Sequence, residues 1–74
     1  MKIIKEWHTK GGAISARFYS CTDNNGVTVY FIDIEGCCKT YEIVPNKDLR
    51  SFLAYCSVYG ISYRYAKFMY SYFN

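Results

Sequence analysis

The residues that most often mark an enzyme are scarce in this chain. It contains one histidine, His8, and one proline, Pro45, and its cysteines and carboxylates show no spacing typical of a nucleophilic or acid–base site. Lys10-Gly11-Gly12 lacks the length and the following helix of a phosphate-binding loop. With a single imidazole and no loop to stabilise an oxyanion, the sequence predicts a protein without enzymatic activity and without a cofactor.

Long hydrophobic runs are absent as well. Charged residues interrupt the segment from Met1 to Trp7, so the apolar stretch of about 7–15 residues that a signal peptide needs does not develop. Elsewhere no apolar run approaches the roughly 20 residues that span a bilayer. We therefore expect a cytoplasmic protein, acting in a host cell, that makes no membrane contact.

Cysteines are present, but not at the spacing of a metal site. Zinc sites need close pairs of ligands such as Cys-x-x-Cys, whereas Cys37 and Cys38 are immediate neighbours, which point to opposite faces of a strand. Without an export signal the chain is expected in a reducing compartment, where buried thiols behave as small hydrophobic side chains. The sequence therefore predicts no bound metal and free thiols at Cys21, Cys37, Cys38 and Cys56.

What the chain does contain is enough apolar material for one small folded domain. Its 74 residues are 51% hydrophobic and 20% aromatic, and no linker, repeat or low-complexity segment divides residues 1–74. Up to residue 44, apolar and polar residues alternate with the period of two of half-buried strands. We predict a small antiparallel meander of three to four strands, over residues 2–9, 13–20, 27–32 and 37–44, with turns at 10–12, 22–26 and 33–36.

After Pro45 the period changes to that of an amphipathic helix. Asn46 can act as the N-cap, and Asp48 falls in the first turn, where the helix dipole favours an anion. Apolar residues at positions i, i+3, i+4 and i+7 predict a buried stripe on a helix that ends at Gly60. The stripe consists of Leu49, Phe52, Leu53 and Cys56.

A second helix is predicted after Gly60, with Ser62 as its N-cap. Ile61, Tyr63 and Tyr65 also alternate as they would in a strand, which leaves a strand as the alternative for residues 61–73. The fold class is therefore α+β, with a meander over 1–44 packed against one or two C-terminal helices over 46–73. The second helical stripe consists of Ile61, Tyr65, Phe68, Met69, Tyr72 and Phe73.

Charge is distributed unevenly along the chain. Residues 1–48 carry six basic and six acidic side chains, whereas residues 49–74 carry three basic side chains, no carboxylate and nine of the fifteen aromatics. Because tyrosine and arginine are enriched in interface hot spots, this C-terminal third is the predicted contact surface. The alternative is that the charged side chains only keep a helix pair hydrated, and that the tyrosines only line the rim of a small core. The predicted partner-binding residues are Tyr55, Tyr59, Tyr63, Arg64, Lys67, Tyr70 and Ser71.

These features predict a small non-enzymatic binding protein. In size, α+β make-up and lack of a catalytic motif, the chain resembles the small inhibitors that phages carry against host defence, such as anti-CRISPR proteins. The resemblance implies a host protein or ribonucleoprotein complex as the partner. It also implies a mechanism, which is occlusion of that protein or of its nucleic-acid channel. Homodimer formation is left open.

The segment from Leu53 to Ser62 supports a second hypothesis. It resembles a helix-turn-helix motif, with a small residue four positions before Gly60, an apolar residue and a serine after it, and packing positions at Ala66 and Met69. It departs from that motif at Tyr59, where the usual residue is aliphatic. The resemblance implies a DNA-binding transcriptional regulator. Two basic side chains on the second helix are few against the roughly 6–10 phosphate contacts of a strong duplex binder, so inhibition of a protein is the first hypothesis.

Overall fold

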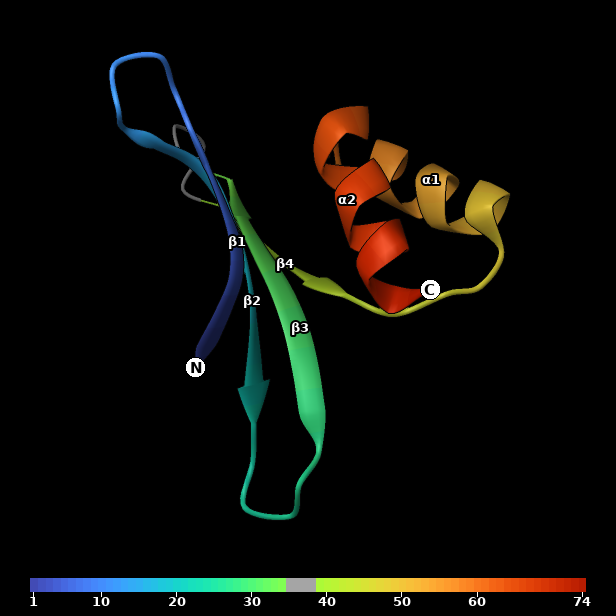
Figure 1. Ribbon diagram of the computed structural model, residues 1–74. Helices are drawn as coiled ribbons and strands as arrows, with labels where there is room; N and C mark the ends of the chain where they lie inside the picture. The colour runs from blue at the N-terminus through green and yellow to red at the C-terminus, as the bar shows by residue number, and fades with distance from the viewer. Residues whose placement is uncertain (35–38) are drawn as a thin grey trace. The chain divides into compact units, whose positions relative to one another are not determined.

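A computed structural model of the protein describes residues 1–34 and 39–74. The described chain forms two compact units, Met1–Val44 and Pro45–Asn74, the first built of strands and the second of helices (Figure 1). The change occurs at Pro45, where the period of the sequence also changes. The predicted α+β class is confirmed, as a four-stranded antiparallel meander followed by two C-terminal helices.

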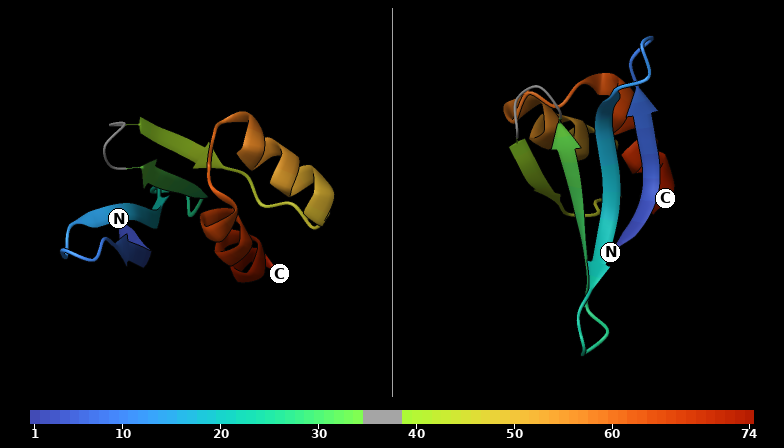
Figure 2. Two further views of the ribbon diagram at one scale, coloured as in Figure 1. Left: turned by 90° about the horizontal axis from the view of Figure 1, so that it is seen from above. Right: turned by 90° about the vertical axis from the view of Figure 1, so that its left-hand side faces the viewer.

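The first unit is one antiparallel sheet in which each strand pairs with the next along the chain. Its first two turns lie where glycine and asparagine clusters predict them, and they close through hydrogen bonds from Thr9 N–H to Ala13 O and from Asp23 N–H to Val27 O. Figure 2 shows the second of these turns projecting beyond the neighbouring strands. The strands are β1 (Lys2–His8), β2 (Ile14–Thr22), β3 (Thr28–Ile34) and β4 (Lys39–Ile43), in the order β1-β2-β3-β4 across the sheet.

The third strand is longer than predicted. Asp33 and Ile34, which were expected to begin a turn, pair with the start of β4, so that prediction is wrong. The sheet accommodates the Asp33 carboxylate because its Oδ1 accepts hydrogen bonds from the hydroxyls of Tyr19, at 3.1 Å, and Thr40, at 2.7 Å. The rest of the predicted turn lies outside the described residues.

One face of the sheet carries the buried side chains of this unit. Trp7 of β1 pairs in register with Ala16 of β2, and Phe18 of β2 pairs with Ile32 of β3. All four are buried, as is Ile43 of β4. The alternation predicted for the second strand, with Ala16 and Phe18 on a shared inner face, is therefore confirmed.

The opposite face of the sheet carries polar and aromatic side chains that contact one another. Arg17 Nε donates to Glu6 Oε2 at 2.9 Å, which joins β2 to β1. The rings of Tyr19 and Phe31 stack with centroids 5.6 Å apart, which joins β2 to β3. Burial, followed by the neighbouring Asp33 carboxylate, raises the pKa of Tyr19. Cross-strand pairs of this kind stabilise the sheet from its outer side.

The second unit consists of α1 (Leu49–Val58) and α2 (Tyr63–Phe73), which lie side by side at an angle to each other (Figure 1, Figure 2). The strand alternative for residues 61–73 is therefore wrong. Ser62 occupies the N-cap position of α2, as predicted, but its side chain makes no capping hydrogen bond. The N-cap of α1 is Asp48 rather than Asn46, because the backbone at Asp48 is still extended, with φ −84° and ψ 110°. The Asn46 side chain accepts the N–H of Asp48 at 2.8 Å and so shapes the turn before the helix. Among the described residues, neither helix has the length and hydrophobicity that a bilayer span requires.

Phe52 is the central contact between the two helices. Its side chain is buried, and its ring centroid lies 5.9 Å from that of Tyr70 and 6.1 Å from that of Phe73, both on α2. Cys56, one turn further along α1, is buried as well. Leu49 was predicted to share this stripe, but it is 47% exposed. It occupies the first helical position, from which a side chain points back past the N-terminal end of the helix.

The buried face of α2 is narrower than predicted. Ala66 and Met69 are buried, together with Ile61 just before the helix. Tyr72 was predicted to belong to the stripe but is 43% exposed. At about 100° per residue, the buried face is centred between Ala66 and Met69, and Tyr72 lies about 90° away from that centre.

The turn between the helices depends on Gly60. Its N–H donates to Ser57 O at 3.0 Å, and the next N–H, of Ile61, donates to Cys56 O at 2.9 Å. This pair of bonds is the Schellman motif, which satisfies the last carbonyl groups of a helix and requires a left-handed residue at this position. Gly60 has φ +72°, a conformation in which a Cβ is strained. Glycine here ends α1 and turns the chain directly into α2.

We expect Phe52→Ala to lower the free energy of unfolding by about 3–5 kcal/mol, since it removes the ring on which both helices converge. Leu49→Ala, on the same helix but half exposed, is the matched control and should cost about 0.5 kcal/mol or less. Urea unfolding followed by far-ultraviolet circular dichroism measures both values. Equal losses in the two variants would show that α1 has a different register.

Candidate binding surface

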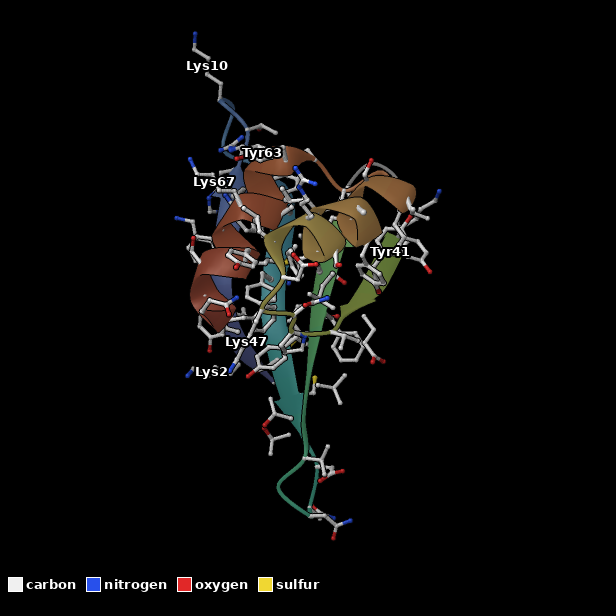
Figure 3. All side chains as sticks on the ribbon, turned by 90° about the vertical axis from the view of Figure 1, so that its right-hand side faces the viewer. Lys2, Lys10, Tyr41, Lys47, Tyr63 and Lys67 are labelled. Atoms are coloured by element: carbon white, nitrogen blue, oxygen red, sulfur yellow. The ribbon has the colours of Figure 1, made fainter. Side chains whose placement is uncertain are left out.

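The exposed side of α2 carries four of the predicted binding residues. On a helix that turns by about 100° per residue, Tyr63, Arg64, Lys67 and Ser71 fall within an arc of about 100°. All four are exposed, Tyr63 to 63%. Figure 3 shows Tyr63 and Lys67, one turn apart, extending outward from α2. We call these four residues the α2 face.

Arg64 lies near a ring on its own helix. Its guanidinium carbon lies 5.9 Å from the centroid of Tyr65, which is within the range of a cation–π contact. The sequence assigned Tyr65 to the apolar stripe of the helix and Arg64 to the contact surface, whereas the two side chains lie close together. The Arg64 side chain nevertheless stays exposed.

Tyr55 and Tyr59 form a separate pair at the end of α1. They are four residues apart, and their ring centroids are 5.1 Å from each other. Tyr55 is half-buried, and Tyr59 is 46% exposed. The pair adds aromatic surface to the helical unit, but it belongs to α1 and to the turn rather than to the α2 face.

Tyr70 makes contacts within the helical unit. It is half-buried, its ring contacts Phe52, and its hydroxyl donates to the carbonyl oxygen of Lys47 at 2.7 Å. Near the end of the same helix, Asn74 Nδ2 donates to Asn46 O at 3.3 Å. These bonds attach the C-terminal part of α2 to the segment before α1. A tyrosine that the sequence assigned to partner binding thus connects the two ends of the helical unit.

Tyr70→Phe should lower the free energy of unfolding by about 0.5–1.5 kcal/mol, because it leaves the ring in place and removes only the hydroxyl that bonds to Lys47. Tyr63→Phe is the control, since the Tyr63 side chain is mostly exposed, and it should leave stability unchanged. Thermal and urea unfolding of both variants provide the comparison. A Tyr70→Phe protein as stable as the parent would mean that the bond to Lys47 O does not form in solution.

The electrostatic character of the helical unit comes from its shortage of carboxylates. Asp48 is the only acidic side chain between Pro45 and Asn74, and it accepts a hydrogen bond from the Ser51 hydroxyl at 2.6 Å. Among the described residues, no ion pair involves either cation of the α2 face. Their charge is therefore directed at solvent or at a partner. The basic side chains of this unit are Lys47, Arg50, Arg64 and Lys67.

A pocket opens beside the turn between the helices, with a volume of about 400 Å³. Tyr63 of the α2 face stands at its edge and is mostly exposed, whereas Cys56 is buried in its wall. Burial raises the pKa of the Cys56 thiol to about 11, so the group is neutral at physiological pH. This pocket was not predicted from the sequence, although the small residue four positions before Gly60 and the apolar residue after it were visible signals. The lining residues are Leu53, Cys56, Ser57, Gly60, Ile61, Tyr63 and Ala66.

The described cysteines are Cys21 and Cys56, and both are free thiols. The predictions for Cys37 and Cys38 fall outside the described residues. In the part of the chain that the structure describes, no three side chains of the metal-ligating types come together. His8, the single histidine, lies with its Nε2 3.7 Å from Glu6 Oε1.

Known proteins do not identify this surface. No protein family, curated protein or solved structure matches the chain.

Proposed function

We propose that this is a non-enzymatic binding protein that attaches to an acidic surface of another protein through the α2 face. One observation carries the proposal: an exposed tyrosine and two exposed cations share one side of a helix in a unit with a single carboxylate. Rigid aromatic rings and arginine supply most of the binding energy at protein interfaces. An acidic partner surface would provide the charges that the helical unit lacks.

An inhibitor of a host defence protein fits this description best. A chain of 74 residues without catalytic chemistry acts by covering a surface that its target needs. Nucleic-acid channels are lined by basic residues, which would repel Arg64 and Lys67. The charge of the α2 face therefore favours attachment to an acidic region of the host protein or ribonucleoprotein, such as a contact needed for its assembly or movement, over insertion into its channel.

The proposal predicts that Tyr63→Ala weakens the complex by about 1–3 kcal/mol, as a hot-spot residue does, and that Lys67→Ala mainly slows association. Tyr72→Ala is the matched control, because Tyr72 is also an exposed tyrosine of α2 but lies outside the α2 face. The protein is immobilised, the target is captured from nuclease-treated host lysate and identified, and the purified complex is titrated with each variant. Equal affinities of the Tyr63 and Tyr72 variants would refute the proposal.

A helix-turn-helix regulator is the second candidate, and the packing of the two helices supports it. Cys56, Ile61, Ala66 and Met69, which occupy the motif's packing positions, are all buried. The turn contains a left-handed glycine, as such motifs often do. Tyr59, the residue that departs from the motif, is 46% exposed.

Salt dependence separates the two candidates. For a protein-binding chain we expect no duplex affinity tighter than about 1 µM at physiological salt, because few phosphates can be neutralised. Binding of a short random-sequence duplex is measured by fluorescence anisotropy over a series of salt concentrations, with the parent and with the Arg64→Ala, Lys67→Ala double variant. Sub-micromolar binding whose salt slope falls by about two in the double variant would establish the regulator instead.

A further inference from the structure

The pocket beside the turn has mostly apolar walls. Leu53 and Cys56 contribute from α1, Ile61 from the turn and Ala66 from α2. None of the lining residues carries a charge at neutral pH, since the Cys56 thiol stays protonated. A volume of about 400 Å³ is at the lower end of the range for binding sites, about 300–1,000 Å³. Such a pocket suits a large apolar side chain and offers no partner to a charged one.

A cation of α2 lies beside this apolar pocket. Lys67 follows the lining residue Tyr63 by four positions on α2, and Figure 3 shows both extending outward. The only carboxylate of the unit, Asp48, is at the opposite end of α1 from the pocket. An occupant therefore meets an uncharged pocket next to the positively charged α2 face, and the carboxylate of the unit is far from it.

We propose that this pocket is the anchor point of the partner, and that it takes an apolar side chain of an acidic amphipathic peptide segment. The inference rests on the proposed function and extends it, because it states which chemistry the acidic partner presents. An amphipathic segment places apolar anchors on one side and carboxylates beside them, which matches an uncharged pocket next to the cations of the α2 face. Tyr63 belongs to both the α2 face and the pocket wall, so it contacts the anchor and its charged neighbours at once.

The experiment uses a displayed library of random peptides selected on the full chain at physiological salt. Selected peptides are synthesised with a fluorescent label and titrated by anisotropy. We expect them to combine Asp and Glu with a Leu, Phe or Trp, and replacing that apolar residue with alanine should weaken binding at least tenfold. This measurement alters only the peptide, so it does not depend on the folding of any protein variant.

A pair of protein variants tests whether the peptides bind in the pocket. Ser57→Trp places a large ring at the pocket from an exposed helical position, whereas Ala54→Trp places the same ring on an exposed position of α1 that does not line the pocket. Circular dichroism confirms that both fold. Ser57→Trp should weaken peptide binding at least tenfold, and Ala54→Trp should leave it unchanged.

These experiments distinguish a failure of the pocket proposal from a failure of the proposed function. Peptides that bind both tryptophan variants equally, but lose affinity on Lys67→Ala, would overturn the pocket and leave the α2 face as the binding surface. Enrichment of basic or uncharged peptides would overturn both the charge argument and the proposed function. Selection of no peptide, together with tight binding of a random-sequence duplex that Ser57→Trp does not affect, would overturn the pocket in favour of nucleic acid.

Discussion

The helical unit depends on the burial of one ring, that of Phe52. Phe73 and Tyr70 contact it from α2, and the Tyr70 hydroxyl also donates to a backbone oxygen before α1. At the other end of the helices, the left-handed turn at Gly60 returns the chain at the angle this contact needs. Ala66 and Met69 are buried on the inner side of α2. The residues on its other side remain exposed, among them Tyr63 and Lys67. The candidate binding surface thus follows from the way the small core is closed.

Most of the fold could be predicted because its signals are local. A period of two, interrupted by turn residues, was enough for the strands, and Pro45 and Ser62 marked where helices begin. The errors occurred at residues whose conformation or burial depends on other residues far away in the sequence. Asp33 reads as a turn residue until Tyr19 and Thr40 supply hydroxyl donors from neighbouring strands. Leu49 and Tyr72 fit the helical period, but periodicity does not reveal how far along a helix, or how widely around it, burial extends.

The candidate surface could be predicted in part. The absence of carboxylates after Asp48 is a property of the sequence, and it identified the basic helical unit without any structure. In contrast, the sequence does not show which tyrosines stay exposed and can contact a partner. Tyr63 and Tyr70 are both tyrosines of one helix, yet one is exposed and the other bonds to Lys47 O, a backbone atom 23 residues away in sequence. The pocket was missed for a related reason, since it forms only when the end of α1, the turn and the start of α2 are placed together.

The position of Trp7 has a practical consequence for studying the two units. It is the single tryptophan of the chain, and it is buried within the strand unit. The aromatic residues of 45–74 are all tyrosine or phenylalanine. Tryptophan emission therefore reports on the environment of the sheet, while the helical circular dichroism signal originates in the other unit. Superimposable denaturation curves from the two signals would mean that sheet and helices melt as one cooperative body, and separated curves would mean that each melts by itself. The natural sequence thus already carries the reporter needed to measure the coupling between its halves.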